Sequence, residues 1–482
     1  MPSLNNHHLP NPHRRQFVIG YSEFIPNEDW RSHKLSSNFW ISYDLNLNLN
    51  RATDKNGIEW FLLGLAIETT ENIAPEDLIS LRSTQEIING YSAWAGRWLL
   101  IGQGEIHLDA NGLLGCFYGE KSSGDIWLSS SPTLLAEIMT TNAQDDRNLV
   151  YGGGISWYTP PYSGYPQIKR LLASQVLNFT TGQISPRPLM PEIDLNRDYE
   201  TSLDLVKNAL VTALQNLGKL KQPIWLGLTA GYDSRLMLVI AIAAQCKFTT
   251  FTRIAGRMSL ADFVIPPQLA KECNIPHIFL NNKLPREQDL RRNLVRQHAG
   301  NNISSGDAEP FIMGVRDSLK GISFGGHGFA IASGFHTLGQ LPANFADPQT
   351  GAVQIAQLFN EPPESSAVAG MTAWLSWVQK HPQANLNWRD RFFLEQRQAG
   401  WLSSKEQVYD LSDLIRFPIL NAARTYSLLL SIPEAKRLDS LVQVAILKQL
   451  NPNLLKYPFN PDNDYFNLWS KLRFKLRNKL RI

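Results

Sequence analysis

The sequence predicts an α/β protein built in two parts, a β-rich part over residues 16–190 and a part with a parallel sheet over 197–482. Short apolar runs bounded by turn residues recur through the first part, which is typical of strands. Strands alternate with helices from residue 199, a pattern typical of parallel sheets. The stretch 185–196 holds three prolines without periodicity and is predicted to be a linker. A length of 482 residues is ample for two or more domains.

Composition limits the functions that need to be considered. A hydrophobic fraction of 43% and a charged fraction of 18% indicate a folded, soluble protein with large cores. The net charge of +3 argues against nucleic acid as a partner. The three cysteines, Cys116, Cys246 and Cys273, are scattered and lack metal-ligand spacing. They form no disulfide framework or zinc site in the sequence pattern, so a reducing cytoplasm is the expected location. No apolar stretch reaches the ~18 residues that span a bilayer. The composition does not indicate the oligomeric state.

The first part is predicted to begin after a disordered leader, residues 1–15, which is rich in Asn, His and Pro. A metal site at its histidines, His7, His8 and His13, is the alternative. Helices are expected near Pro75–Gly90 and Pro132–Met139, and a hairpin strand at Gln175–Thr180. The other expected strands are, in order, Gln16–Tyr21, Phe39–Tyr43, Trp60–Ile67, Trp98–Ile101, Glu105–Leu108, Leu114–Tyr118 and Ile126–Ser129.

The second part is predicted to open with a helix over Tyr199–Leu217, because Leu203, Val206, Leu210 and Ala213 recur at helical spacing. From about residue 350 onward the chain is predicted to be mainly helical. Between these segments the expected elements are a strand at 224–229, a helix from 234, a strand at 248–254, a helix at 262–273 and a strand at 277–280.

The polar turn between the first strand and helix of this part, residues 228–234 (LTAGYDS), is a candidate anion site. In a parallel sheet, ligands bind at the carboxyl ends of the strands, near helix N-termini. Small residues at 229–231 let backbone N–H groups approach a phosphate, and the helix start supplies more of them. Asp233 would repel a phosphate, so it either caps the helix or holds Mg²⁺ that neutralises the phosphates.

The stretch Thr229–Ser234 resembles the Ser-Gly-Gly-x-Asp-Ser pyrophosphate loop of the PP-loop ATP-pyrophosphatases, with Ala230 in place of the usual glycine. More narrowly, the chain resembles the asparagine synthetase family, which includes β-lactam synthetases and lasso-peptide cyclases. Asp262 falls roughly where the family often has an acidic residue opening the next helix. Further segments are similar to that family, namely TTFTR at 249–253, DAEPF at 307–311, ISFGGHGF at 322–329, RFPIL at 416–420 and LNPNLLKYPFN at 450–460.

The N-terminal half resembles a class II glutamine amidotransferase (Ntn) domain. The similar segments are GRWLLIGQGEIHLDANGLLGCFYG at 96–119, IWLSSSPTLL at 126–135 and IKRLLASQVL at 168–177. The resemblance implies an Ntn-like α+β sandwich followed by a doubly wound PP-loop domain with a helical C-terminal part. A working glutaminase of this class needs an N-terminal cysteine, and the first cysteine here is Cys116, which is expected in the core. The domain is therefore expected to be inactive as a glutaminase.

The resemblance implies an ATP-dependent amide ligase that uses ATP and Mg²⁺, a small-molecule or peptide carboxylate and an amine. Asp233, Ser234 and Arg235 are the expected catalytic residues, with Asp233 as a metal ligand. Arg235 could instead pair with a carboxylate, Arg253 could form a surface salt bridge, His327 could bond to backbone, and Tyr232 could shield the loop. The residues assigned to ATP are Leu228, Thr229, Ala230, Gly231, Tyr232, Asp233, Ser234, Thr252, Arg253, Gly325, Gly326 and His327.

The later segments also depart from the family pattern, with His327 standing at the place of the family's first glutamate. Ala330 and Ile331 stand where the family has an aspartate for Mg²⁺ and often a glutamate, and Leu414 replaces a further glutamate. Asp307 or Glu309 could supply the second metal ligand. These departures favour, as the alternative, a nucleotide- or partner-binding protein without catalysis.

A tRNA-modifying PP-loop enzyme is a third interpretation, suggested by the basic tail 471–482. On a helix the tail would spread its charge all round. It could touch anionic lipid, RNA or an acidic partner, or remain a solvated terminus, which is the favoured interpretation.

Overall fold

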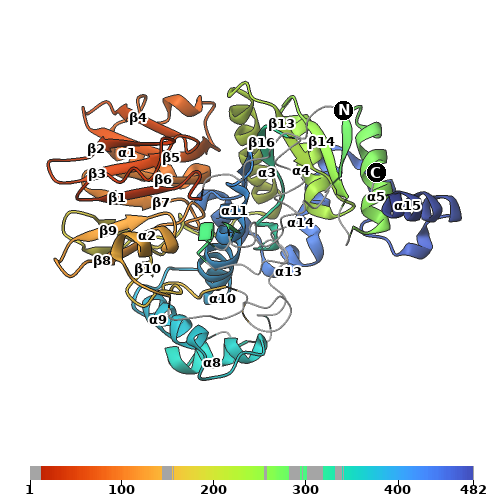
Figure 1. Cartoon of the computed structure of the whole chain (residues 1–482). Helices are drawn as coiled ribbons and strands as arrows, with labels where there is room; N and C mark the ends of the chain where they lie inside the picture. The colour runs from red at the N-terminus through yellow and green to blue at the C-terminus, as the bar shows by residue number, and fades with distance from the viewer. Residues whose placement is uncertain are drawn as a thin grey trace.

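The computed structural model describes residues 12–143, 155, 157–254, 258–281, 294–295, 297–300, 319–331, 339, 341–342 and 344–480, without the side chains of 281 and 477–480. Within these residues the chain forms three sheets, two of them antiparallel and one parallel. The antiparallel sheets lie together at one end of the molecule, and the parallel sheet lies toward the other (Figure 1). The protein is therefore a mixed α/β structure, as the sequence predicts.

The first part of the described chain contains two six-stranded antiparallel sheets. The order β10-β8-β9-β1-β3-β2 forms one sheet and β12-β11-β7-β6-β5-β4 the other. The first sheet consists of β1 (Phe17–Gly20), β2 (Trp30–Lys34), β3 (Trp40–Asp44), β8 (Phe117–Glu120), β9 (Ile126–Ser129) and β10 (Lys169–Arg170). The second consists of β4 (Leu49–Thr53), β5 (Glu59–Glu68), β6 (Trp94–Gly102), β7 (Glu105–Leu108), β11 (Gln175–Asn178) and β12 (Ile184–Pro186).

The two sheets pack face to face to form a sandwich with helices outside. One core contains side chains from both sheets, among them Phe17, Ile41, Leu63 and Ile101. The outer face of the first sheet is covered by α2 (Pro132–Met139) through Leu134 and Leu135. The outer face of the second carries the 3₁₀ turn η1 (Pro75–Asp77), α1 (Thr84–Gly90) and the 3₁₀ turn η2 (Tyr91–Ala93).

The ends of the sandwich differ from the sequence expectations in two places. Residues 12–15 of the expected leader form a turn in which His13 is buried and bonds to Gln16 and Glu137. His7 and His8 lie outside the described residues. The first residues of the expected linker form β12, and Leu189 and Met190 beyond it are buried in the core around the parallel sheet. This segment is therefore packed rather than a free tether, because its apolar side chains fill a space between the two parts.

The second part contains a five-stranded parallel sheet of order β15-β14-β13-β16-β17 within the described residues. Its strands are β13 (Ile224–Gly227), β14 (Thr249–Ile254), β15 (His277–Asn281), β16 (Gly321–Phe324) and β17 (Leu414–Phe417). All four pairings are parallel. β13 comes first in the sequence and lies at the centre of the sheet, between β14 and β16. The turn after β13 therefore lies between the loops that follow β14 and β16.

Helices packed on this sheet bury a large apolar core. α3 (Tyr199–Gly218) and α14 (Leu441–Leu450) pack against α4 (Tyr232–Ala243), and α5 (Leu260–Glu272) packs against β14 and β15. The remaining helical elements are η3 (Phe329–Ile331), α8 (Pro348–Leu358), α9 (Ser366–Lys380), α10 (Trp388–Phe392), η5 (Phe393–Leu402), α11 (Ser403–Tyr409), α12 (Ala423–Leu430), α13 (Glu434–Arg437), η6 (Leu438–Ser440), η7 (Pro452–Lys456), η8 (Asn463–Tyr465) and α15 (Leu468–Leu480).

α10, the π-helix η5 and α11 follow one another without a break and lie between the sandwich and the parallel sheet (Figure 1). Arg97 of β6 donates two hydrogen bonds of 2.9 Å to the carboxylate of Asp410, just after α11. One turn earlier, buried Glu406 pairs with Arg416 of β17 at 3.3 Å. Two acids one helical turn apart thus join an arginine of each part.

None of the described helices is long and apolar enough to cross a lipid bilayer.

Removal of the Asp410 carboxylate should lower the unfolding free energy of the protein, because it breaks the buried pair with Arg97. The Asp410→Ala change leaves Arg97 buried without its carboxylate, which should cost about 3–5 kcal/mol of unfolding free energy. Urea unfolding followed by tryptophan fluorescence measures the loss. Arg51→Ala is the control, because the Arg51–Glu59 pair is exposed and its loss should cost under ~1 kcal/mol. Equal losses of unfolding free energy in the two variants would show that the buried pair stabilises the protein no more than the exposed pair does.

Candidate functional site at the carboxyl edge of the parallel sheet

The turn between β13 and α4 is held in shape by its own side chains. The Ser234 hydroxyl accepts a hydrogen bond from the Thr229 N–H at 3.0 Å and lies 2.9 Å from the Thr229 hydroxyl. Leu228 and Ala230 are buried, whereas Thr229 is exposed. Thr252 of β14 donates to the Leu228 carbonyl at 2.7 Å and fixes the turn to the neighbouring strand. The predicted contact of Ser234 with pyrophosphate therefore competes with bonds inside the turn.

The N-terminus of α4 has no capping side chain among the described residues. Gly231 is the N-cap residue. The first N–H groups of an α-helix have no partner within the helix, so a ligand can take them. They carry the positive end of the helix dipole, which favours an anion.

Asp262 lies beside the turn and is bonded to it. Ser259 caps α5 by accepting from the Asp262 N–H, which places Asp262 in the first turn of that helix. The Asp262 carboxylate in turn accepts from the Ala230 N–H at 2.8 Å. One of the amides predicted to hold phosphate is therefore occupied by a carboxylate.

Asp233, in the first turn of α4, contacts two elements that are distant in sequence, α14 and the loop after β16. Its carboxylate accepts from the Gln443 side chain of α14 at 3.0 Å. Burial raises the pKa of Asp233 above its ordinary value, and the bond from Gln443 offsets part of this rise. A Cβ at Gly326 would lie 2.5 Å from the Asp233 Cβ, so the glycine-rich loop after β16 packs directly on Asp233. The structure thus brings together the two segments that sequence similarity assigns to one site.

His327 of the same loop contacts Arg416 at the end of β17. The two ring nitrogens lie 3.3 and 3.4 Å from the Arg416 guanidinium. The His327 side chain is exposed to solvent. Loss of hydration and, second, the positive charge of Arg416 lower the pKa of His327 to about 3. The imidazole is therefore neutral at physiological pH.

A cluster of charged and aromatic side chains surrounds His327 at this edge of the sheet. Burial opposes ionisation of both Glu406 and Arg416, yet their attraction leaves the pKa of Glu406 lowered and that of Arg416 raised. Arg253, at the end of β14, donates to the Tyr409 hydroxyl at 2.8 Å. The Tyr409 ring lies 4.6 Å from the Arg416 guanidinium carbon and 5.3 Å from that of Arg253. Among the described residues Arg253 thus contacts a tyrosine, and the surface salt bridge considered from the sequence stays a prediction.

Arg235 is directed away from the open end of the turn. It is fully buried, and its guanidinium lies 3.9 Å from the centre of the Phe459 ring. The Tyr232 ring stacks on the same phenylalanine with centroids 3.9 Å apart. This packing replaces the expected contact of Arg235 with phosphate or with a carboxylate. The guanidinium donates to four backbone carbonyls, those of Ala230, Leu454, Tyr457 and Pro458.

The second metal ligand expected from the sequence, Asp307 or Glu309, lies outside the described residues. Ala330 is exposed and Ile331 is buried, so neither position supplies a carboxylate. Across the part of the chain that the structure describes, no group of three or more His, Cys, Asp or Glu side chains could hold a metal ion. Among the described residues, Asp233 in the first turn of α4 and Asp262 in the first turn of α5 are the carboxylates at the turn that a divalent cation could use, together with its ligand's own oxygens.

Sequence reasoning missed Glu406 and Tyr409 as members of the site. Neither lies in a recognisable motif, and their positions follow from the packing of α11 against β17. Arg416 belongs to the RFPIL segment at 416–420, for which the sequence predicts no functional role. A signal for Arg416 exists, because a charged residue in a short buried strand needs a partner.

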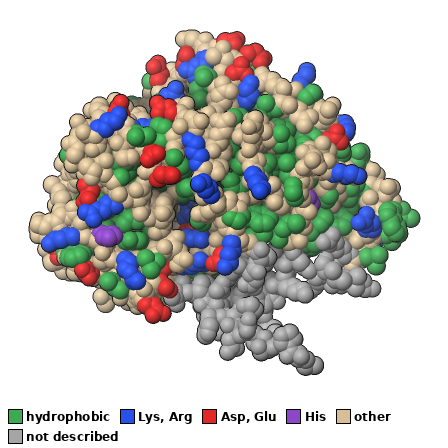
Figure 2. Space-filling model, turned by 90° about the horizontal axis from the view of Figure 1, so that it is seen from above, with side chains coloured by type: hydrophobic (Ala, Val, Ile, Leu, Met, Phe, Trp, Pro, Cys, Tyr) green, Lys and Arg blue, Asp and Glu red, His purple; other side chains and the backbone are tan. Residues whose placement is uncertain are grey.

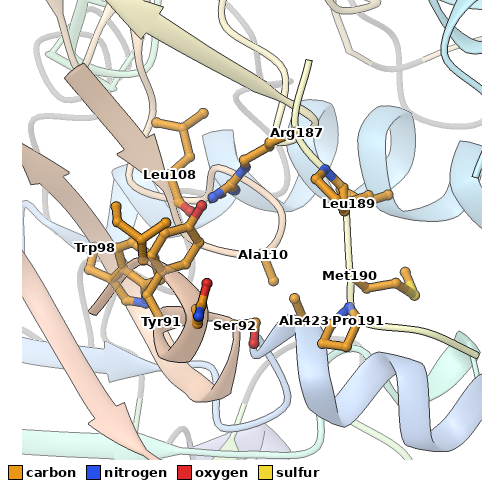
Figure 3. Close-up of a pocket in the computed structure, with 13 residues that line it drawn as sticks. Tyr91, Ser92, Trp98, Leu108, Ala110, Arg187, Leu189, Met190, Pro191 and Ala423 are labelled. Carbon is orange, nitrogen blue, oxygen red and sulfur yellow. Dashed lines mark hydrogen bonds between the residues drawn. The ribbon is translucent and has the colours of Figure 1, made fainter. Parts of the chain in front are cut away.

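A separate cavity of about 220 Å³ lies between the sandwich and the segment at 187–191 (Figure 3). The Arg187 side chain extends over the Tyr91 ring and donates to the carbonyls of Leu108 and Ala173. Its charge is therefore already engaged by the protein. The cavity contains none of the site residues predicted from the sequence. Its lining also includes Ile88, Asn89, Ser92, Trp98, Ala110, Pro188, Leu189, Met190, Pro191 and Ala423.

Comparison with known proteins gives no family for the chain. No family model matches the sequence, and the search of the curated proteins found no match. Among solved structures, the chain is similar to the allosteric regulatory enzyme of purine biosynthesis, with 13% identity over 61% of this chain and 74% of that chain and a TM-score of 0.24. It is also similar to glutamine phosphoribosylpyrophosphate amidotransferase from B. subtilis complexed with ADP and GMP, with 12% identity over 72% of each chain and a TM-score of 0.22. At these TM-scores the similarity carries no argument about fold or activity.

Gly326→Ala should disturb the contact between the glycine-rich loop and Asp233. A methyl group 2.5 Å from the Asp233 Cβ forces the loop or α4 to move, and such overpacking costs about 1–3 kcal/mol. Thermal unfolding of the variant measures the cost. Gly325→Ala is the matched control, because its added methyl group would meet only the His327 ring at 3.4 Å. A variant at 326 as stable as the one at 325 would contradict the close packing.

The raised pKa of Asp233 predicts a pH-dependent effect of Asp233→Asn. A carboxyl whose pKa is higher in the folded protein than in the unfolded chain reduces stability as it ionises, from its ordinary value of 3.8 upward. Without divalent cations, the Asn variant should therefore unfold at a higher temperature than the wild type at neutral pH. The difference should shrink as the pH falls toward 3.8, because protonated Asp and Asn are both neutral. A difference that does not change with pH would contradict the assignment.

Proposed function

We propose that the chain is an ATP-dependent ligase that adenylates a carboxylate, releases pyrophosphate and transfers the acyl group to an amine, without hydrolysing glutamine. One observation carries the proposal: the uncapped start of α4, Asp233 and the glycine-rich loop meet at the carboxyl edge of the parallel sheet. This edge is where open α/β sheets bind their ligands.

The resemblance of the sequence to the asparagine synthetase family supports the same proposal. Its pyrophosphate-loop segment, 229–234, lies at a βα turn, and its glycine-rich segment follows the neighbouring strand β16. The face-to-face sandwich at residues 17–186 is compatible with an Ntn-like domain. We therefore assign the parallel-sheet part to the PP-loop class as part of this proposal.

ATP and Mg²⁺ fit the residues present at the turn. Backbone N–H groups at the start of α4 would bind phosphate oxygens. Asp233 and Asp262 would hold Mg²⁺, because Mg²⁺ takes one or two carboxylates together with substrate phosphates. Within the described residues, neither carboxylate forms an ion pair with Lys or Arg, so both are available to a cation. When bound, Mg²⁺ would neutralise charge on the phosphates.

Binding would require Asp262 to release the Ala230 amide. A phosphate oxygen can take that N–H in its place, and the released carboxylate can then turn to the cation. In the structure the Asp262 carboxylate satisfies the Ala230 amide.

The cluster at the end of β17 supplies positive charge and a neutral imidazole for the reaction. Arg253 and Arg416 would stabilise the negative charge that develops on the transferred phosphoryl group. In the first step a carboxylate oxygen attacks the α-phosphorus and pyrophosphate leaves. In the second step an amine attacks the acyl carbon, AMP leaves and the amine gives up a proton. Most of the enzyme's contribution is positioning and charge stabilisation.

The cysteines support the absence of glutamine hydrolysis. Burial raises the pKa of the Cys116 thiol to about 12 and that of Cys246 to about 11, and it raises the pKa of Cys273 as well. A nucleophilic cysteine needs a lowered pKa. Cys116 lies in the sandwich core, as predicted.

Asp233→Ala should abolish conversion of ATP to AMP and pyrophosphate, because the variant lacks the carboxylate that would hold Mg²⁺. Pyrophosphate release with candidate carboxylates and amines measures turnover, and circular dichroism checks the fold. Asp204→Ala is the control, since Asp204 is an exposed aspartate of α3 outside the site. Turnover retained in Asp233→Ala would contradict the assignment.

A binding protein without catalysis is the second candidate, favoured by the carboxylate on the Ala230 amide and by Ala330 and Ile331. Calorimetry with ATP and Mg²⁺, followed by the pyrophosphate assay, distinguishes the two candidates. Binding without pyrophosphate release under any condition would favour the binding protein. Release that depends on an added carboxylate would favour the ligase.

A further inference from the structure

The helix α15 (Leu468–Leu480) presents an apolar face to solvent. Leu468 is 73% exposed, Trp469 67%, Leu472 43% and Leu476 57%. The three leucines are spaced by four residues, so they lie on one side of the helix, and Trp469 lies beside them. An exposed stripe of large apolar side chains marks an interaction surface.

The opposite side of α15 fastens the helix to the protein. The Phe474 ring lies 5.5 Å from the Phe263 ring of α5. Phe474 is about 200° around the helix axis from Leu472, at 100° per residue. The helix therefore docks by one side and turns its leucines and Trp469 outward.

Basic residues border the apolar stripe on both sides. Lys471 and Lys475 flank it on one edge, and Arg473 flanks it on the other. Arg473 and Lys475 are exposed, while Lys471 lies 3.5 Å from Asp464. From residue 466 to 482 the sequence contains no Asp or Glu. The exposed side of α15 is therefore apolar in the middle and positive at its edges.

α15 lies at the end of the molecule farthest from the sandwich, beyond α5 (Figure 1). Apolar side chains gather at this end in the view from above (Figure 2). α15 and its exposed apolar side chains therefore lie at the opposite end of the molecule from the sandwich.

We propose that α15 binds the surface of a bilayer that contains anionic lipids, with Leu468, Trp469, Leu472 and Leu476 in the interface and Lys471, Arg473 and Lys475 at the headgroups. Helices with an apolar face, basic borders and an aromatic residue lie in the bilayer interface in this way. A second copy of the chain fits less well, because its basic borders would meet like charges. Nucleic acid would leave the apolar stripe in water.

Co-sedimentation of the full-length protein with vesicles tests the proposal. Binding is expected to vesicles of phosphatidylcholine with phosphatidylglycerol, to weaken with salt, and to be at least tenfold weaker for phosphatidylcholine alone. Trp469→Glu with Leu472→Glu should abolish binding. Arg473→Glu with Lys475→Glu should weaken it by at least about fivefold for each basic residue.

The controls match each change at an exposed position away from α15. Leu45→Glu replaces a leucine that is 51% exposed, and Lys55→Glu reverses an exposed charge, both in the sandwich. Equal binding to neutral and anionic vesicles, or α15 variants that bind as the controls do, would overturn the proposal. A dimer that Trp469→Glu dissociates, without vesicle binding by the wild type, would overturn it in favour of a second copy.

Discussion

Two acidic side chains on one turn at the end of α11 hold the two parts of the protein in register. Asp410 binds Arg97 of the sandwich and Glu406 binds Arg416 of the parallel sheet. Both pairs are buried, so each charge depends on its partner and the spacing between the parts is fixed by one helical turn. The π-helix that precedes α11 sets the direction from which these acids enter. The position of Arg416 beside His327 follows from this arrangement.

The candidate site is consequently built from two charge regions that face one sheet edge. On one side, Asp233 and Asp262 lie at the starts of α4 and α5 and supply negative charge. On the other, Arg253 and Arg416 supply positive charge around Tyr409. A nucleotide with a bound cation needs both kinds of charge at once, since its phosphates bind cations and the cation binds carboxylates. The Asp262 carboxylate on the Ala230 amide shows the turn already holding an anionic group.

Much of the fold could be predicted because local patterns specify it. The strands 224–227 and 249–254 and the helix 199–218 lie close to their expected places, since apolar periodicity fixes them. β2 was missed because WRSHK carries only one large apolar side chain, and β17 because it lies in a region predicted to be mainly helical. The position of the turn at 228–234 between a strand and a helix could be predicted, but the packing of Arg235 could not. Its carbonyl partners at 454–458 are more than 200 residues away, and no local pattern encodes them. That the turn binds an anion stays a prediction.

The packing of residues 454–460 on the turn has a consequence for how the protein matures. Arg235 needs the carbonyls of Leu454, Tyr457 and Pro458, and Tyr232 needs the Phe459 ring. During synthesis, Arg235 is translated more than 200 residues before these partners. Until then, only one of the four carbonyls that accept hydrogen bonds from Arg235 in the structure is present, that of Ala230. The described conformation of the turn therefore depends on residues 454–460 as well as on its own sequence.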